Sequence, residues 1–129
     1  MKDLVQFAKA LADPNRVRIL AVLRQGEVCV CEIADALAIP QSSLSTHLQC
    51  LRAAGVVKAS KKGTWAYYAI EDWAKPVLEG LEVHFSSLKD PRLLQDEARL
   101  QARLAMREDG CCVVGFRQPL IQLGDKKRK

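Results

Sequence analysis

The segment from residue 41 to residue 70 limits the possible folds of this chain more than any other part of the sequence. In its first half, residues 41–54, three leucines fall at spacings of four and three and share one face of a helix, while the other faces are polar. Two apolar runs follow, one from Val56 onward and one at residues 65–70, and the sequence Lys61-Lys62-Gly63 separates them. We therefore expect a helix with one apolar face, followed by a β-hairpin that has a basic, glycine-containing turn.

The apolar residues elsewhere in the chain are also spaced for helices. The spacing predicts helices at residues 3–12, 14–25, 31–37 and 92–107, together with one that begins after Asp72. Asp13-Pro14 marks the start of the second helix, because a proline at the first helical position lacks an N–H that would have no partner there. A narrow seam, typical of a helix that packs against a partner helix, is formed by Leu78, Leu81, Phe85 and Leu88. The predicted fold class is mainly α with one small β-hairpin.

Positive charge is concentrated in two parts of the sequence. Residues 36–70 contain no acidic residue and four basic ones, and residues 126–129 are all lysine or arginine. The two blocks together carry eight positive charges, whereas the formal net charge of the whole chain is +5, so the rest of the chain is acidic on balance. An acid-free basic segment suits the phosphate backbone of a nucleic acid. For the terminal block, a solvated tail is the simpler explanation.

The length and the cysteines indicate the broad class of the protein. With 129 residues, the chain is long enough for one hydrophobic core and too short for two. No stretch approaches the roughly 18 consecutive apolar residues of a membrane-spanning helix, and the first residues do not form a secretory signal, so we expect a cytoplasmic protein. Because thiols stay reduced there, the five cysteines are better interpreted as thiols, metal ligands or redox sensors than as a disulfide framework. Cys50, which lies between two leucines of the polar helix, is expected to pack as a small apolar residue.

A short helix, a turn, a polar helix and a basic hairpin follow one another in the order of a winged helix-turn-helix. The helix that reads DNA in this fold keeps an apolar stripe for its own core and exposes short polar side chains that reach base edges in the major groove. The candidates for this role are Gln41, Ser42, Ser43, Ser45, Thr46 and His47, and Arg52 could contact either base edges or phosphates. The candidates for contacts with phosphates, which position a protein without reading the base sequence, are Lys58, Lys61 and Lys62. For each residue alone an ordinary exposed surface is an equally good explanation, so the prediction depends on the whole set.

Four sequence blocks resemble those of the ArsR/SmtB family of metal-responsive repressors. Residues 10–20 (ALADPNRVRIL) resemble the second-helix signature of this family, and residues 26–33 (GEVCVCEI) resemble its metal-binding box. Residues 41–57 resemble its recognition helix, and residues 63–68 (GTWAYY) resemble its wing. The resemblance covers residues 4–72. It implies a homodimeric winged-helix repressor that leaves its double-stranded operator DNA when a metal or metalloid binds.

On this interpretation the chain has two parts. Residues 1–108 form the winged helix-turn-helix with its dimerisation helices, which lie at the N- and C-terminal ends of the domain. Residues 109–129 form a C-terminal segment that carries an adjacent pair of cysteines, Cys111 and Cys112, and the basic tail.

Cys29 and Cys31 lie in the block that resembles the metal-binding box. In a regular helix, residues two apart point roughly 200° away from each other, so their sulfur atoms cannot share an ion. In extended backbone the two side chains point to the same side. We therefore expect a soft ion that binds both thiolates to favour an unwound start of the helix at residues 31–37, which would couple ion binding to DNA binding.

Two sulfur atoms are too few for tight binding, so a third ligand is needed. The arsenic-sensing box of the family often has a third cysteine three positions after the second, where this chain has Ala34. The candidates are Cys111 and Cys112, and the sequence leaves open which of them binds and from which protomer. Three thiolates suit As(III) or Sb(III), whereas Cd(II) and Pb(II) favour a fourth donor. We expect As(III) or Sb(III) as the inducer and keep Cd(II) or Pb(II) as the alternative.

Two other functions use the same cysteines. A thiol redox-sensing repressor of the same fold would form a disulfide between Cys29 and Cys31 or between Cys111 and Cys112. A thiol phosphatase or arsenate reductase would use the five-residue spacing between Cys111 and Arg117. That segment has little glycine to cradle a phosphate, and too few residues follow it to build a supporting sheet. We therefore expect a regulator and not an enzyme.

Overall fold

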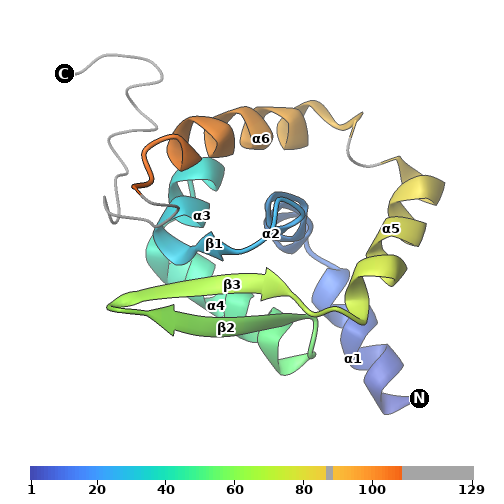
Figure 1. Ribbon diagram of the computed structural model, residues 1–129. Coiled ribbons are helices and arrows are strands. Elements are labelled where there is room, and N and C mark those ends of the chain that lie inside the picture. The colour runs from blue at the N-terminus through green and yellow to red at the C-terminus, as the bar shows by residue number, and fades with distance from the viewer. Residues whose placement is uncertain (87–88, 109–129) are drawn as a thin grey trace.

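The computed structural model describes residues 1–86 and 89–108, and it has the mainly helical fold that the sequence predicts (Figure 1). The helices are α1 (Lys2–Leu11), α2 (Pro14–Leu23), α3 (Val30–Leu37), α4 (Gln41–Ala53), α5 (Ala74–Phe85) and α6 (Pro91–Leu104). The strands are β1 (Val28–Cys29), β2 (Val57–Lys62) and β3 (Trp65–Ile70). Within the described ranges, none of the helices combines the length and the apolar character needed to span a membrane. The predictions for Leu88, Cys111, Cys112, Arg117 and residues 126–129 fall outside the described residues.

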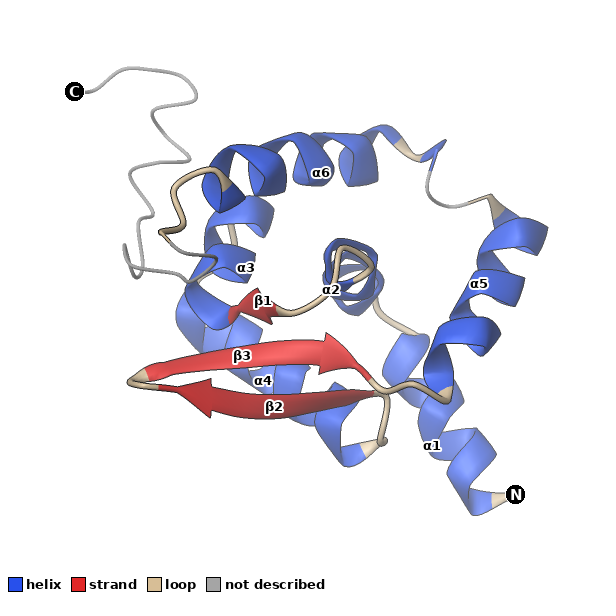
Figure 2. Cartoon of the chain, in the orientation of Figure 1, coloured by secondary structure: helices blue, strands red, loops and turns tan. Residues whose placement is uncertain are grey.

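The three strands form one antiparallel sheet in the order β1-β3-β2 (Figure 2). β2 and β3 are the two arms of the predicted hairpin, and Gly63 at its turn has a φ of +64°, which favours glycine. β1 is not among the predicted elements, because two residues are too few to show an alternating pattern. It pairs with β3 through Val28 opposite Tyr68 and Cys29 opposite Tyr67. This pairing brings one of the candidate ligands against the hairpin.

Asp13 begins α2, as the sequence predicts. Its carboxylate oxygen Oδ1 accepts hydrogen bonds from the backbone N–H groups of Asn15 (2.8 Å) and Arg16 (3.2 Å), and Pro14 occupies the first helical position. Burial raises the pKa of Asp13, but the two backbone hydrogen bonds outweigh it and hold this pKa below its ordinary value of 3.8. The carboxylate is therefore charged at neutral pH and caps the helix.

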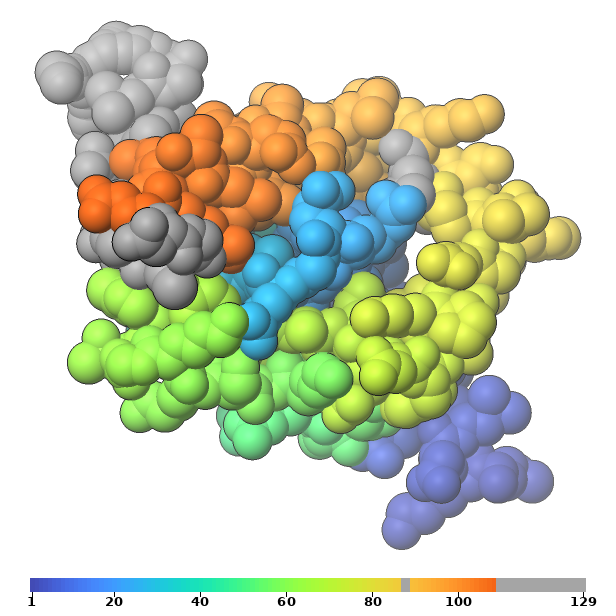
Figure 3. Space-filling view, viewed as in Figure 1, coloured from blue at the N-terminus to red at the C-terminus, as the bar shows by residue number. Residues whose placement is uncertain are grey.

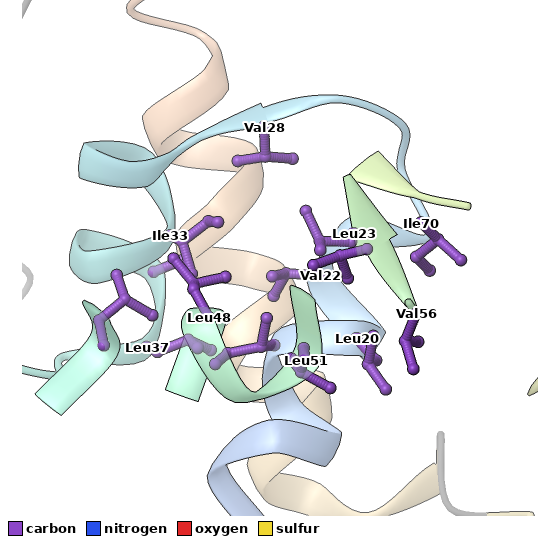
Figure 4. Packing of buried hydrophobic residues seen from close by; sticks show 14 of the residues in the cluster. Leu20, Val22, Leu23, Val28, Ile33, Leu37, Leu48, Leu51, Val56 and Ile70 are labelled. Atoms are coloured by element: carbon purple, nitrogen blue, oxygen red, sulfur yellow. The ribbon is translucent and has the colours of Figure 1, made fainter. Parts of the chain in front are cut away.

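The core lies between α2, α3, α4 and the sheet. α2 crosses the middle of the molecule, and its buried side chains include Leu20, Val22 and Leu23 (Figure 4). The apolar stripe of α4 is the predicted one, and each of its members is at most 1% exposed: Leu44, Leu48 and Leu51. The polar faces of α4 are consequently turned away from the core.

α6 packs against α3 and α2 of its own chain (Figure 1). It buries Leu93 and Leu100. Two ion pairs join α6 to its neighbours, Arg18–Asp96 (2.8 Å) with α2 and Asp35–Arg103 (2.6 Å) with α3. A third pair joins Glu32 in the first turn of α3 to Arg107, which follows the end of α6 (2.7 Å). The carboxylate side chains of all three pairs are at most 1% exposed. The sequence assigns the C-terminal helices to dimerisation, but the inner face of α6 is already covered by its own chain.

Exposed apolar side chains gather on α1 and α5 instead. Leu4 on α1 is 67% exposed, and Val83 and Phe85 on α5 are 83% and 68% exposed. The two helices lie on the same side of the molecule (Figure 1), where the ring of Phe7 in α1 is 5.7 Å from the ring of Trp73 just before α5. The first turns of α1 project from the body of the molecule (Figure 3).

Candidate functional site

The polar faces of α4 form an exposed surface, as a DNA-reading helix requires. The exposed members of the predicted set are Gln41, Ser42, Ser43, Ser45, Thr46 and Arg52 on α4 and Lys58, Lys61 and Lys62 on β2. Because residues 36–70 contain no acid, neither α4 nor the hairpin contributes a negative side-chain charge to this surface. Its charge and its short polar side chains suit DNA.

His47 differs from the other predicted reading residues, because it is half-buried and contacts its own chain. Its Nδ1 atom lies 3.3 Å from Nη1 of Arg16. The same guanidinium donates hydrogen bonds to the carbonyl oxygens of Ala10 (2.7 Å) and Lys9 (3.2 Å) at the end of α1. Arg16 therefore links α1 to the predicted reading helix.

Lys62, at the end of β2, is exposed but contacts the segment before β1. Its ammonium group donates a hydrogen bond to Glu27 and lies 4.9 Å from the centroid of the Tyr67 ring. Hydrogen bonds from Lys62 and from the hydroxyl of Ser60 hold the pKa of Glu27 below its ordinary value. The tip of the hairpin is thus connected to the residues that lead into β1.

Cys29 and Cys31 meet at the junction between β1 and α3. Cys29 ends β1 and is the N-cap of α3, with extended backbone (φ −71°, ψ 146°), whereas Cys31 lies in the first turn of the helix. Their sulfur atoms are 3.1 Å apart, and both residues are fully buried. Tyr67 packs with both of them, and Trp65 lies beside the same cluster. The junction therefore holds two sulfur atoms that face each other.

The two sulfur atoms meet here without unwinding of the start of α3, so the unwinding that the sequence predicts for a bound ion stays a prediction. The rotation of roughly 200° between residues two apart applies only when both residues lie in the helix. Here the extended Cys29 precedes the helix, and Cys31 alone belongs to it. The sulfur atoms therefore approach each other while α3 is helical from Val30 onward.

Glu32, which follows Cys31 in the sequence, is fully buried and fixes this junction. Its Oε1 atom accepts a hydrogen bond from the backbone N–H of Cys29 (2.9 Å), as in a capping box. Arg107 donates from Nη2 to the same oxygen and from Nε to Oε2, both at 2.7 Å. Arg107 also donates to the carbonyl oxygen of Glu27 (3.1 Å). One guanidinium therefore contacts the chain on both sides of Cys29.

The described residues hold the thiol pair but no group of three or more His, Cys, Asp or Glu side chains able to bind a metal ion. The predicted third ligand, Cys111 or Cys112, lies outside these residues. Cys50 is half-buried against the core, which confirms its prediction as a packing residue. The described part of the site thus supplies two soft donors, which suit soft, thiophilic ions.

Three residues at this junction, Glu32, Arg107 and Tyr67, are absent from the residues predicted from the sequence. A signal for the first two exists, because acidic residues three apart at 32 and 35 complement arginines four apart at 99, 103 and 107. Arg103 on α6 pairs with Asp35, and Arg107, which follows the end of α6, pairs with Glu32. Tyr67 carries no such signal, since its contact with the thiols depends on the pairing of β1 with β3.

The arrangement of α3, α4 and the hairpin defines a winged helix-turn-helix protein, with a thiol pair at the start of the first helix of the helix-turn-helix. The sequence model of the family described as "Bacterial regulatory protein, arsR family" matches residues 13–59. An HTH-type transcriptional regulator of Methanocaldococcus jannaschii is 47% identical over 76 residues, which cover 57% of this chain and 85% of that protein. The chain belongs to the ArsR family of regulatory proteins.

Further relatives agree with this assignment. The arsenic resistance transcriptional regulator ArsR1 of Pseudomonas putida is 41% identical over 78 residues, which cover 57% of this chain and 61% of that protein. Other relatives are named an arsenical resistance operon repressor in Bacillus subtilis and a cadmium resistance regulatory protein homologue in Staphylococcus aureus. The solved homodimeric winged helix-turn-helix DNA-binding domain from Mycobacterium bovis has a TM-score of 0.64 at 32% identity, and the match covers 67% of this chain and 81% of that chain. These relatives confirm the prediction of a regulator and not an enzyme.

Proposed function

We propose that this chain is a DNA-binding transcriptional repressor that dissociates from its operator when As(III) or Sb(III) binds its cysteine thiolates. The observation that carries the proposal is the pair of sulfur atoms of Cys29 and Cys31, which lie 3.1 Å apart at the start of α3. α3 packs against α4, the proposed reading helix. A change at the thiols therefore acts on the element that supports the reading surface. The names of the arsenical-resistance relatives support the choice of inducer.

The DNA-binding part of the proposal rests on α4 and the hairpin. We assign contacts with base edges to Gln41, Ser42, Ser43, Ser45, Thr46 and His47, contacts with phosphates to Lys58, Lys61 and Lys62, and either kind of contact to Arg52. The exposure of these side chains and the absence of acids from the segment support the assignment. His47 and Lys62 would exchange their present contacts with Arg16 and Glu27 for contacts with DNA.

The proposed repressor is a homodimer that forms through α1 and α5. These helices carry exposed apolar side chains, whereas the inner face of α6 is covered by its own chain. A groove of about 1010 Å³ lies between α2, the sheet and α5, and the side chains of Leu81, Val83 and Phe85 on α5 line it. Pairing of this surface with a second copy would remove apolar area from water. It would also set two reading helices side by side for the two halves of an operator.

We propose that the third ligand is Cys111 or Cys112, from the same protomer or from its partner. Arg107 is bonded to Glu32 at the thiol site. Cys111 follows Arg107 by only four residues in the sequence. Three thiolates suit As(III) and Sb(III), whereas the alternative inducers Cd(II) and Pb(II) would favour a fourth donor.

The closeness of the two sulfur atoms also favours a second candidate function, a repressor that senses oxidants. Oxidation by a peroxide would join Cys29 and Cys31 in a disulfide, and the two electrons and two protons that leave the thiols would reduce the peroxide to water. This reaction needs no third ligand, which distinguishes it from metalloid binding.

Titration of the protein on labelled DNA separates these candidates. The probe is a duplex that the protein itself selects from a random-sequence pool. We expect arsenite to release this duplex at concentrations at which Cd(II), Pb(II) and hydrogen peroxide do not. Release by peroxide alone would replace the metalloid proposal with the redox one. Cys111→Ser and Cys112→Ser, tested separately, identify the third ligand, and an unchanged arsenite response in both would remove them from the site.

A further inference from the structure

We propose that Arg107, acting through Glu32, is a positioning residue that holds the thiols of Cys29 and Cys31 in the arrangement that binds a metalloid. This inference rests on the proposed function of the thiol pair. Arg107 and Glu32 are not ligands in the proposal. They fix the backbone from which one ligand projects.

The contacts of Arg107 enclose the junction that carries the thiols. The guanidinium bonds to both carboxylate oxygens of Glu32, on the C-terminal side of the pair, and to the carbonyl oxygen of Glu27, on the N-terminal side. Glu32 in turn holds Cys29 in place, because its Oε1 atom accepts a hydrogen bond from the backbone N–H of Cys29 (2.9 Å). The fork of Arg107 and the carboxylate of Glu32 therefore hold residues 27–32 at three points.

Tyr67 closes the opposite side of the same junction. It is the strand partner of Cys29, and its buried ring packs with both cysteines. The Cζ atom of Arg107 lies 5.9 Å from the centroid of this ring. The thiol pair is therefore enclosed by Arg107, which follows α6, and by Tyr67 of the hairpin.

We call these contacts of Arg107, Glu32 and Tyr67 with the junction the clamp. The clamp raises the affinity of the thiol pair for a metalloid by preorganisation. A ligand that needs both sulfur atoms binds most tightly when they already face each other, because no backbone has to be ordered on binding. Cys29 is extended and Cys31 is helical, so their closeness depends on the sharp change of backbone conformation at Val30. Without Arg107, the backbone of residues 27–32 loses its contacts with this guanidinium and becomes more mobile, so the two sulfur atoms face each other for a smaller fraction of the time.

Arg99 provides the matched control for Arg107. It lies on α6, eight residues before Arg107 in the sequence, and its Nη1 atom donates to the carbonyl oxygen of Ala36 (3.3 Å) and lies 3.5 Å from Asp96. Arg99→Met therefore removes an arginine that also joins α6 to α3 but does not contact residues 27–32. A purely structural role for α6 predicts equal effects of Arg107→Met and Arg99→Met.

The test measures arsenite binding by the full chain, from the near-ultraviolet absorption of the sulfur–arsenic bonds. We expect Arg107→Met to weaken binding about tenfold, which corresponds to about 1.4 kcal/mol, while Arg99→Met stays within about threefold of the wild type. Arg107→Lys keeps the charge without the two-pronged geometry and should fall between them. Equal affinities of Arg107→Met and Arg99→Met would overturn the proposal.

A double variant covers the case in which Arg107→Met does not fold. If Arg107→Met does not fold because Glu32 is left buried and charged, the double variant Arg107→Met/Glu32→Gln removes that charge, and its arsenite affinity is expected to be about tenfold lower than that of the wild type.

The alkylation rate of the thiols tests the clamp without arsenite. Alkylation of Cys29 and Cys31 by iodoacetamide, followed by mass spectrometry, should be faster in Arg107→Met than in Arg99→Met. If the wild type bound no arsenite but alkylation was still faster in Arg107→Met than in Arg99→Met, the proposed function would fail and the positioning role of Arg107 would stand. Equal alkylation rates would overturn the clamp itself.

Discussion

Replacement of Arg18 by Met is expected to destabilise the fold by about 3 kcal/mol, because it removes the main partner of a buried carboxylate. Arg18 donates to both oxygens of Asp96, from Nε at 2.8 Å and from Nη2 at 2.9 Å, and Asp96 is 1% exposed. The same guanidinium donates to the carbonyl oxygen of Leu37 (2.7 Å) and to Oδ1 of Asn15 (2.9 Å). It thereby joins α2 to the end of α3 and to α6.

The magnitude follows from these contacts. Removal of one partner of a buried ion pair costs about 3–5 kcal/mol. We take the lower end of this range, because Arg18 is 13% exposed and Arg99 stays 3.5 Å from Asp96. In a domain of this size each kcal/mol lowers the Tm by roughly 4 °C, so the variant should melt about 12 °C lower. Thermal unfolding followed by circular dichroism measures the shift.

The double variant Arg18→Met/Asp96→Leu tests the assigned cause. Replacement of a buried ion pair by apolar residues of similar volume is often close to neutral. The double variant should therefore recover most of the stability that Arg18→Met loses. If it is no more stable than Arg18→Met, the loss does not come from the uncompensated charge of Asp96, and the explanation given for it is wrong.

Three further predictions concern the helix cap, the DNA contacts and the dimer. Asp13→Ala should lower the free energy of unfolding by about 1 kcal/mol at neutral pH. Because the folded-state pKa of Asp13 is below 3.8, this contribution is present above pH 3.8 and is lost as the pH falls through the folded-state pKa, so urea unfolding should find no difference between variant and wild type in strong acid. Lys61→Ala should weaken binding to all DNA sequences alike and reduce the slope of log K against log salt concentration by about 1 in fluorescence anisotropy, and an unchanged slope would remove Lys61 from the interface. Phe85→Glu on α5 should yield monomers in analytical ultracentrifugation, whereas Leu94→Glu on α6, where Leu94 is 58% exposed, should leave the dimer intact.

The sequence predicts the helices and the hairpin because their signals are local. Leucine spacing identifies the buried stripe of α4, and Asp13-Pro14 identifies the start of α2. β1 escapes prediction because it has two residues and exists only through its pairing with β3. The packing of α6 also escapes prediction, since an apolar helical face does not reveal whether it meets its own chain or another copy.

The sequence predicts only part of the thiol site, because local signals identify the cysteines but not the contacts that hold them. The spacing of Cys29 and Cys31 identifies them as a candidate pair, but the pair spans the boundary between a strand and a helix, and neither regular geometry describes it. The support from Arg107 joins two residues 75 positions apart in the sequence, because Glu32 lies in α3 and Arg107 follows the end of α6. Such a contact depends on tertiary packing, and only the complementary spacing of charges on the two helices indicates it beforehand.

The DNA affinity of the protein with and without arsenite tests the link between the thiol pair and DNA binding most directly. We expect arsenite to raise the Kd of the wild type for its selected duplex by roughly 5- to 150-fold, the usual range of coupling between two sites. Cys29→Ser and Cys31→Ser should bind the duplex with nearly the wild-type Kd and show no change with arsenite. An unchanged Kd of the wild type, or equal release of Cys31→Ser by arsenite, would contradict the assignment of the thiol pair as the sensor.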